Sequence, residues 1–168
     1  KELLKYAQTD ALTGLYNKET TEQLTDELLS EDENKYHAFL ILDVDCFKQI
    51  NDIYGHAVGD IVLQKFGKLL KGTFREGDIL GRIGGDEFGV IMKNIQTKDI
   101  AMKKAEELLA KTQAYKIDEL KGNNISISIG ISTAPQDGDC YMDLYKRADQ
   151  ALYQAKRSGK ARVCNYFS

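Results

Sequence analysis

The sequence predicts an α/β or α+β domain with a central sheet, because amphipathic helical segments alternate with short apolar strands. First, a run of five apolar residues, Ala38–Leu42, is typical of a strand covered on both faces. Second, apolar segments over residues 79–83 and 88–92 flank a Gly-Gly turn and predict a hairpin. Third, isoleucine alternates with serine or glycine over residues 125–131, which predicts a further strand with one face of small residues.

Helical segments separate these strands. Asn17 is a candidate N-cap for a helix that ends near Ser30. Further helices are expected over residues 47–54, from about residue 60 after a Gly-rich connection, over residues 100–109, and over residues 141–155 before a stop at Gly159. Residues 1–8 have the pattern of a helix arriving from an upstream domain, and residues 162–166 predict a final edge strand. Residues 9–168 then form one domain.

Composition excludes several classes of protein. The 168 residues hold 23 Lys and Arg against 26 Asp and Glu, a balance that argues against a nucleic-acid-binding surface. No apolar run approaches the ~20 residues that span a bilayer, so we expect no membrane contact from this segment. Cys46, Cys140 and Cys164 are odd in number and lack a CxxC spacing, which favours a reducing, cytoplasmic location over a disulfide framework or a zinc site.

Two acidic groups are candidates for metal binding. The first apolar strand ends at Asp43-Val44-Asp45, and the hairpin tip carries Asp86 and Glu87. If the hairpin lies beside that strand, Asp86 comes near Asp43, and the Val44 carbonyl can add the oxygen ligand that Mg²⁺ prefers. Two metals about 3.5–4 Å apart can stabilise the attacking and leaving oxygens of nucleotidyl transfer. Each group taken alone is also compatible with a solvated turn.

Polar residues after the first strand are candidates for nucleotide binding. Lys48 and Asn51 share one face of the next helix, where Lys48 can meet a phosphate and Asn51 offers a donor and an acceptor to a purine. Asp60 can accept hydrogen bonds from the N1–H and exocyclic amine of guanine. The competing interpretation of Asp60 is a helix N-cap, and the residue pattern alone favours the cap.

A basic segment lies near the end of the chain. Residues 146–162 contain six basic residues and one acidic residue, within an acidic protein. Lys156 and Lys160 lie four positions apart on either side of the helix stop, where cations ordinarily interact with a helix C-terminus. Together with the acidic groups, this segment indicates an anionic, metal-bound ligand such as a nucleoside triphosphate.

These motifs resemble one known family. Gly84-Gly85-Asp86-Glu87-Phe88 is the signature of the GGDEF family of bacterial diguanylate cyclases, and the resemblance covers essentially the whole chain. The other matching segments are Asp10–Leu15 with Asn17, Leu42–Asp45, Phe47-Lys48, Ile50–Asp52, Tyr54–His56, Gly59-Asp60, Ala148-Asp149, Ala151–Tyr153 and Ala155–Gly159. The resemblance implies a palm-like α+β fold, similar to nucleotidyl cyclases and polymerase palms. The implied fold has a mostly antiparallel central sheet surrounded by helices and carries the GGDEF β-hairpin.

The resemblance also implies an activity, the condensation of two GTP into cyclic di-GMP with release of two pyrophosphates. It implies Mg²⁺ or Mn²⁺, two per active half-site, held by Asp43, the Val44 backbone and Asp86. In addition, Asp86 would serve as the base for the 3′-hydroxyl, and Glu87 would complete the acidic site.

The implied substrate contacts and partners follow from the same matches. Asn51 and Asp60 would bind guanine, while Lys48, Lys156 and Lys160 would neutralise phosphates. Each domain would hold one GTP, so that catalysis requires a homodimer and an upstream sensory domain can control it.

A further match is Arg75-Glu76-Gly77-Asp78, which fits the family's RxxD inhibitory site for the cyclic di-GMP product; a loose surface ion pair is the competing interpretation. Lys160 stands where Arg is common, and Cys46 stands where His or an aromatic residue is frequent. We expect Cys46 to be a buried packing residue. The alternatives to a cyclase are a catalytically silent module that binds GTP or cyclic di-GMP, and a cyclase for another purine, against which Asp60 argues.

Overall fold

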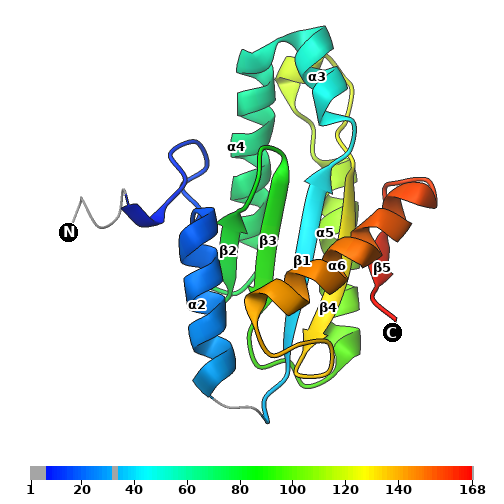
Figure 1. Ribbon diagram of the computed structural model, residues 1–168. Helices are drawn as coiled ribbons and strands as arrows, with labels where there is room; N and C mark the ends of the chain where they lie inside the picture. The colour runs from blue at the N-terminus through cyan, green and yellow to red at the C-terminus, as the bar shows by residue number, and fades with distance from the viewer. Residues whose placement is uncertain (1–6, 32–33, 168) are drawn as a thin grey trace.

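A five-stranded sheet forms the centre of the protein (Figure 1). The computed structural model describes residues 7–31 and 34–167. The strands are β1 (His37–Val44), β2 (Ile79–Arg82), β3 (Glu87–Met92), β4 (Ile127–Ala134) and β5 (Val163–Asn165), in the spatial order β2-β3-β1-β4-β5. Strand β1 is antiparallel to both β3 and β4, β2 is antiparallel to β3, and β5 joins β4 in parallel. The prediction of a mostly antiparallel sheet is therefore confirmed.

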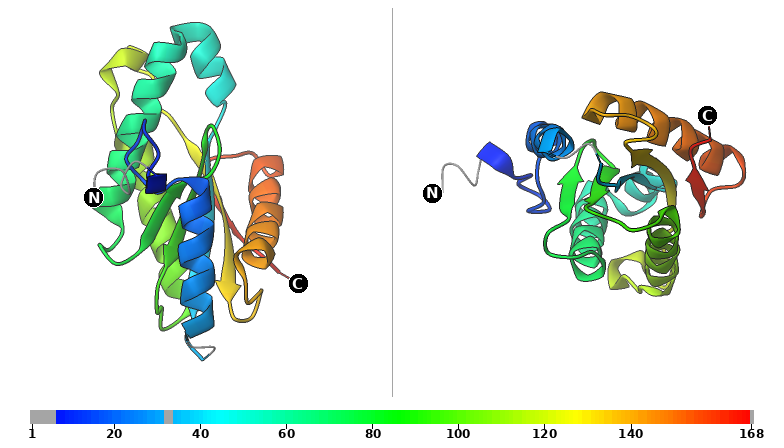
Figure 2. Two further views of the ribbon diagram at one scale, coloured as in Figure 1. Left: turned by 60° about the vertical axis from the view of Figure 1, so that its left-hand side comes forward. Right: turned by 90° about the horizontal axis from the view of Figure 1, so that it is seen from below.

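Helices cover both faces of this sheet. They are α2 (Lys18–Glu31), α3 (Phe47–Tyr54), α4 (His56–Thr73), α5 (Lys98–Ala114) and α6 (Tyr141–Arg157), with a short 3₁₀ helix, η1 (Asp118–Leu120). The view along the sheet places α2 and α6 on one face and α4 and α5 on the other (Figure 2). None of these helices, within the described residues, has the length and apolar character needed to cross a bilayer.

Strand β1 separates two apolar clusters. Phe39 and Ile41 pack with residues of α2 and α6, whereas Leu40 and Leu42 pack with residues of α4 and α5. Successive strand residues point to opposite faces, so a strand between two helical layers must be apolar at nearly every position. Every residue of β1 is buried, as the apolar run predicts.

Helix α6 lies directly on β4. A Cβ atom added at Gly130 would come within 2.2 Å of the Ala148 carbonyl oxygen, so only glycine permits this approach. The Ser132 hydroxyl donates a hydrogen bond to the Leu144 carbonyl at 2.8 Å. The small-residue face predicted for this strand is therefore the face on which α6 rests.

The boundary between α3 and α4 differs from the prediction. Helix α4 begins at His56 rather than near Asp60, because Gly55 adopts a φ of +91° and turns the chain within one residue. The Gly55 N–H donates to the Asn51 carbonyl at 2.9 Å and thereby closes α3. Asp60 is the fifth residue of α4, so its interpretation as an N-cap is wrong.

The N-terminal segment caps one helix and pairs with one strand. The Asn17 side chain accepts a hydrogen bond from the Thr20 N–H at 2.9 Å, which confirms the predicted N-cap. The Tyr16 N–H donates to the Leu80 carbonyl at 3.0 Å, and the Arg82 N–H donates to the Tyr16 carbonyl at 2.9 Å. Tyr16 thus covers the outer edge of β2. The helix expected over residues 1–8 lies outside the described residues except at its last two positions, which are helical.

Candidate active site

Pairing of β1 with β3 brings together acids that are distant in the sequence. Asp43 is the register partner of Glu87, and the Val44 N–H donates to the Asp86 carbonyl at 3.3 Å. We call Asp43, Asp86 and Glu87 the acid edge. The side-chain oxygens of these three acids do not all lie within 4.8 Å of one another. In the described part of the chain, the only three potential metal ligands that lie this close together are Asp139, Cys140 and Asp143 at the start of α6.

Asp43 is buried and incompletely paired. Its side chain contacts the Lys156 ammonium through Oδ2, while Oδ1 is buried without a hydrogen-bond partner among the described residues. Burial raises the pKa of Asp43, the Lys156 contact opposes this, and the charges of Asp86 and Asp149 add to the rise. A buried carboxylate oxygen without a donor is a fitting ligand for a cation.

The pKa values of Glu87 and of the neighbouring Lys156 are also raised. The Glu87 carboxylate accepts a hydrogen bond from the Tyr145 hydroxyl at 2.7 Å. Burial nevertheless raises the pKa of Glu87, and the charges of Asp43 and Asp149 contribute to the rise. The pKa of Lys156 is also raised, because the hydrogen bond that its ammonium donates to Asp43 and the charges of the nearby acids outweigh the effect of its burial. Negative charge therefore exceeds positive charge at this edge.

Asp45 lies two residues after Asp43 and has a different role. Its carboxylate accepts hydrogen bonds from the Ser126 hydroxyl at 2.7 Å, the Ser128 hydroxyl at 2.6 Å and the Ala161 N–H at 3.0 Å. These donors satisfy both oxygens. Asp45 therefore joins β1 to β4 and to the segment after α6, and it is not part of the acid edge.

The candidate guanine contacts meet where α3 joins α4. A Cβ atom at Gly59 would lie 1.9 Å from the Asn51 Oδ1, so the Asn51 amide packs on Gly59, directly before Asp60. Asp60 is exposed, and Asn51 is half-buried. Lys48 is exposed one turn before Asn51 on the same face of α3. The structure thus brings these three polar side chains to one region.

Lys160 lies beside the start of α3. Its ammonium is 3.4 Å from the Cys46 sulfur. Cys46 is exposed and has a left-handed backbone with a φ of 56°, so the expectation of a buried packing residue is wrong. The strand ends at a reversal directly before α3, and this reversal turns the Cys46 side chain outward. Lys156, in the last turn of α6, contacts Asp43, and Lys160 follows that helix, so both lysines lie near the end of β1.

The Arg75–Asp78 loop lies away from the acid edge, at the β2 side of the sheet. Asp78 is buried and accepts hydrogen bonds from the Arg75 N–H at 3.2 Å, the Arg75 guanidinium at 3.2 Å and the Lys93 N–H at 3.1 Å. The guanidinium also contacts the Lys93 carbonyl. The interpretation as a loose surface pair is therefore wrong for Asp78, whose side chain is 1% exposed, although that of Arg75 is 60% exposed.

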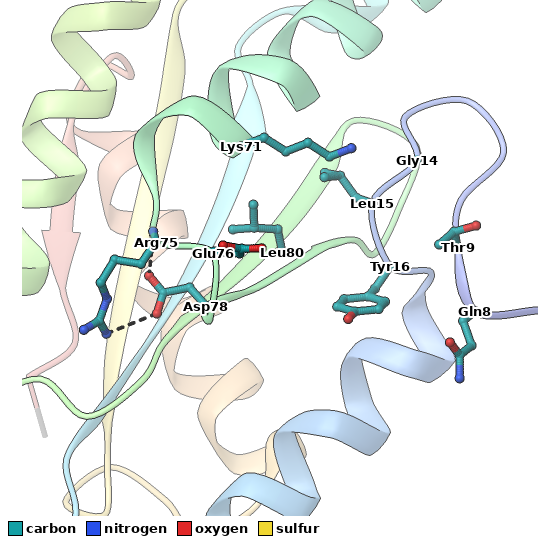
Figure 3. Close-up of a pocket in the computed structure, with 10 residues that line it drawn as sticks. All are labelled: Gln8, Thr9, Gly14, Leu15, Tyr16, Lys71, Arg75, Glu76, Asp78 and Leu80. Carbon is teal, nitrogen blue, oxygen red and sulfur yellow. Dashed lines mark hydrogen bonds and ion pairs between the residues drawn. The ribbon is translucent and has the colours of Figure 1, made fainter. Parts of the chain in front are cut away.

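A cavity of about 570 Å³ adjoins this loop (Figure 3). Its lining comes from the N-terminal segment, the end of α4, the loop and β2, and consists of Gln8, Thr9, Gly14, Leu15, Tyr16, Lys71, Arg75, Glu76, Asp78 and Leu80. Figure 3 shows the Arg75 guanidinium turned toward Asp78 and away from Lys71, so in this conformation its charge faces away from the cavity.

Arg82 holds the hairpin tip, a role that was not predicted from the sequence. Its guanidinium donates to the Gly85 carbonyl at 3.1 and 2.8 Å and pairs with Asp10 at 3.1 Å. Burial acts to raise the pKa of Asp10, but hydrogen bonds from Thr13 and the charge of Arg82 outweigh it and lower that pKa. The position of Arg82 two residues before the Gly-Gly turn is the one sequence feature that could have indicated a contact with the hairpin tip.

Comparison with known proteins agrees with this geometry. A mixed sheet between helices, with an acidic hairpin beside its central strand, is the palm-like fold of nucleotidyl cyclases. Within that class the chain belongs to the GGDEF family, since the family model "Diguanylate cyclase, GGDEF domain" matches residues 7–162. The predicted family and fold are both confirmed.

Individual relatives share the family and the fold. The chain is 37% identical over 168 residues to Diguanylate cyclase A of Treponema denticola, covering 96% of this chain but only 45% of that protein. Among solved structures, the GGDEF domain of TpbB (YfiN) from Pseudomonas aeruginosa is 33% identical with a TM-score of 0.89, covering 95% of this chain and 94% of that one. The coiled coil and GGDEF domain of DgcB from Caulobacter crescentus, solved in complex with c-di-GMP, is 26% identical with a TM-score of 0.89, covering 98% and 88%.

Proposed function

We propose that this chain is a diguanylate cyclase domain that condenses two GTP into cyclic di-GMP and releases two pyrophosphates. The observation that carries the proposal is the acid edge, in which one oxygen of buried Asp43 has no hydrogen-bond partner in the described part of the chain and lies beside Glu87 and Asp86. Membership of the GGDEF family and a relative named diguanylate cyclase support the same assignment.

The acid edge fits a divalent cation. A pair of Mg²⁺ or Mn²⁺ ions would be held by Asp43, the Val44 carbonyl and Asp86. These ligands are all oxygens, and the negative charge of the acids exceeds the positive charge of the neighbouring Lys156. When bound, the ions would lower the pKa of the attacking hydroxyl and neutralise charge on the triphosphate. Asp86 accepts the proton of the 3′-hydroxyl, and the Glu87 carboxylate adds negative charge to the site.

The residues at the α3–α4 junction bind the base. Asp60 accepts hydrogen bonds from the N1–H and 2-amino groups of guanine, which adenine cannot donate, and the Asn51 amide supplies the complementary donor and acceptor. Lys48 and Lys160 neutralise the phosphates as point charges. Lys156, which contacts Asp43, balances charge between the acid edge and the triphosphate.

Two copies of the domain are needed for the reaction. Each supplies one GTP, and the 3′-hydroxyl of one must reach the α-phosphate of the other, so the homodimer supplies the proximity that speeds the step. A domain upstream of this chain would then control activity by controlling dimerisation. Cyclic di-GMP would inhibit the enzyme at Arg75 and Asp78, once Arg75 turns from its contact with Asp78 toward the ligand.

Incubation with GTP and Mg²⁺ tests the proposal directly. We expect one cyclic dinucleotide and two pyrophosphates for every two GTP, a rate per domain that rises with protein concentration, and no product from ATP. Pyrophosphate release is measured continuously and the dinucleotide by mass spectrometry. Nucleotide binding without any product, across the concentration series, would instead establish a silent binding module.

A further inference from the structure

Helix α6 contacts the acid edge at two points. Lys156 contacts Asp43 near the end of the helix, and Tyr145 donates to Glu87 at 2.7 Å. The two residues are eleven positions apart, which is three helical turns, so they lie on the same face of α6. Tyr145 supplies the one side-chain hydrogen bond to the Glu87 carboxylate among the described residues.

The ring of Tyr145 is held by the core. It packs on Phe39, with ring centroids 6.5 Å apart, and on Tyr141, with centroids 5.8 Å apart. Both neighbouring rings are fully buried. The helix itself is fixed on β4 by its close approach at Gly130 and by the hydrogen bond from Ser132 to the Leu144 carbonyl. The position of the Tyr145 hydroxyl is therefore set by packed groups and not by a mobile surface side chain.

We propose that Tyr145 is a positioning residue that fixes the Glu87 carboxylate through its Oε1 and leaves its Oε2 available to the substrate side of the acid edge. The role of Glu87 in turnover rests on the proposed function. A glutamate has three side-chain torsions, and one neutral donor removes much of that freedom without cancelling the negative charge. Lys156 differs in this respect, because it compensates charge at Asp43.

Tyrosine suits this role because its hydroxyl stays protonated. Burial and the neighbouring Glu87 carboxylate both raise the pKa of Tyr145, so the group remains a donor across the physiological range. Phenylalanine would keep the packing on Phe39 and Tyr141 but would release Glu87. The substitution Tyr145→Phe therefore separates positioning from packing.

The test compares Tyr145→Phe with Tyr153→Phe in the full chain. Tyr153 is on the same helix and is 57% exposed, so its substitution controls for the loss of a hydroxyl from α6. For Tyr145→Phe we expect kcat to fall about 10-fold, since small misplacement of a reacting group is costly, with KM for GTP within twofold of wild type and at most a small fall in unfolding temperature, because Glu87 loses one donor. Side-chain ¹³C relaxation of Glu87 in the ligand-free protein should show greater disorder in Tyr145→Phe and no change in Tyr153→Phe.

Several outcomes would overturn the inference. One is Glu87 order that is unaltered in Tyr145→Phe, and another is a fall in kcat that Tyr153→Phe reproduces. A change confined to KM or to unfolding temperature would assign Tyr145 to substrate binding or packing instead. If the wild type shows no turnover, the proposed function fails, and the ligand-free relaxation measurement still decides whether Tyr145 positions Glu87.

Discussion

Two buried aspartates, Asp43 on the acid edge and Asp78 in the Arg75–Asp78 loop, have opposite surroundings. Asp78 accepts three hydrogen bonds, which leave neither oxygen without a donor. Asp43 contacts one ammonium and keeps a buried oxygen unpartnered among the described residues. Burial alone therefore does not define the role of an acid. The three donors of Asp78 favour its burial as a carboxylate, whereas burial raises the pKa of Asp43 and thus disfavours its charged form.

The largest effect is expected at the acid edge. Asp86→Ala should lower turnover at least about 100-fold, the scale seen when one preorganised charge-stabilising group is lost. The fold should survive, because Asp86 is a half-buried residue of a turn. Pyrophosphate release and circular dichroism measure the two properties. Asp139→Ala, an exposed acid at the far end of α6 from Lys156, should behave as wild type; substantial activity in Asp86→Ala would remove this residue from the site.

The loop aspartate should show the reverse result. Asp78→Ala removes the acceptor of three donors and should lower the free energy of unfolding by about 3 kcal/mol, while the initial rate at low temperature persists. Urea denaturation gives the first quantity. Glu76→Ala, an exposed acid in the same loop, should change stability by less than about 0.5 kcal/mol. Equal effects of the two substitutions would contradict the anchoring role of Asp78.

The effect of the acid edge on the free energy of unfolding should depend on pH. The pKa of Glu87 is raised in the folded protein, so its contribution to stability is present below its ordinary pKa and is lost as the pH rises through the folded value. Glu87→Gln keeps an acceptor for Tyr145 and removes the charge. We expect it to match the wild type near pH 4 and to exceed its unfolding free energy by about 0.5–1 kcal/mol at pH 7.

Urea denaturation across this pH range measures the gap for Glu87→Gln. Glu106→Gln, an exposed position on α5, is the matched control and should follow the wild type at every pH. If the difference in unfolding free energy between Glu87→Gln and the wild type became smaller as the pH rises, the burial of charged Glu87 would not be unfavourable.

The smallest effect on stability is expected for Arg75→Ala. The Arg75 side chain is largely exposed, and Asp78 keeps the Lys93 N–H, so the unfolding free energy should fall by less than about 1 kcal/mol. Added cyclic di-GMP should inhibit the variant less than the wild type, with the initial rate unchanged. Arg157→Ala, outside the loop, should retain full inhibition. An unaltered inhibition curve for Arg75→Ala would reduce Arg75 to a surface charge.

Local patterns predicted most of the fold. The apolar run of β1, the Gly-Gly hairpin and the alternation in β4 each follow from a periodicity that the chain shows within a few residues. Three interpretations were wrong: Asp60 as an N-cap, Cys46 as a buried packing residue, and Asp78 as part of a loose surface pair. The first two concern the turns on either side of α3. There the backbone direction is fixed by Gly55 and by the end of β1, and the local pattern of Gly-Asp before apolar residues imitates a helix start.

The candidate site was only partly accessible from the sequence. Motif positions indicated the acids and lysines, because these lie at strand ends and helix ends. The donors that orient them were missed, since Tyr145 is 58 residues from Glu87 and Arg82 is 72 residues from Asp10. Such contacts depend on how helices and loops pack on the sheet, and no short-range spacing encodes them.

The pairing of Tyr16 with β2 has a consequence for how the protein behaves at high concentration. Unpaired backbone groups along a sheet edge act as a template for strands of other molecules. A chain shortened to begin at Lys18 would uncover the Leu80 carbonyl and the Arg82 N–H, and molecules would then associate edge to edge. We therefore expect the solubility of this domain to depend on the backbone of Tyr16, a residue outside the acid edge.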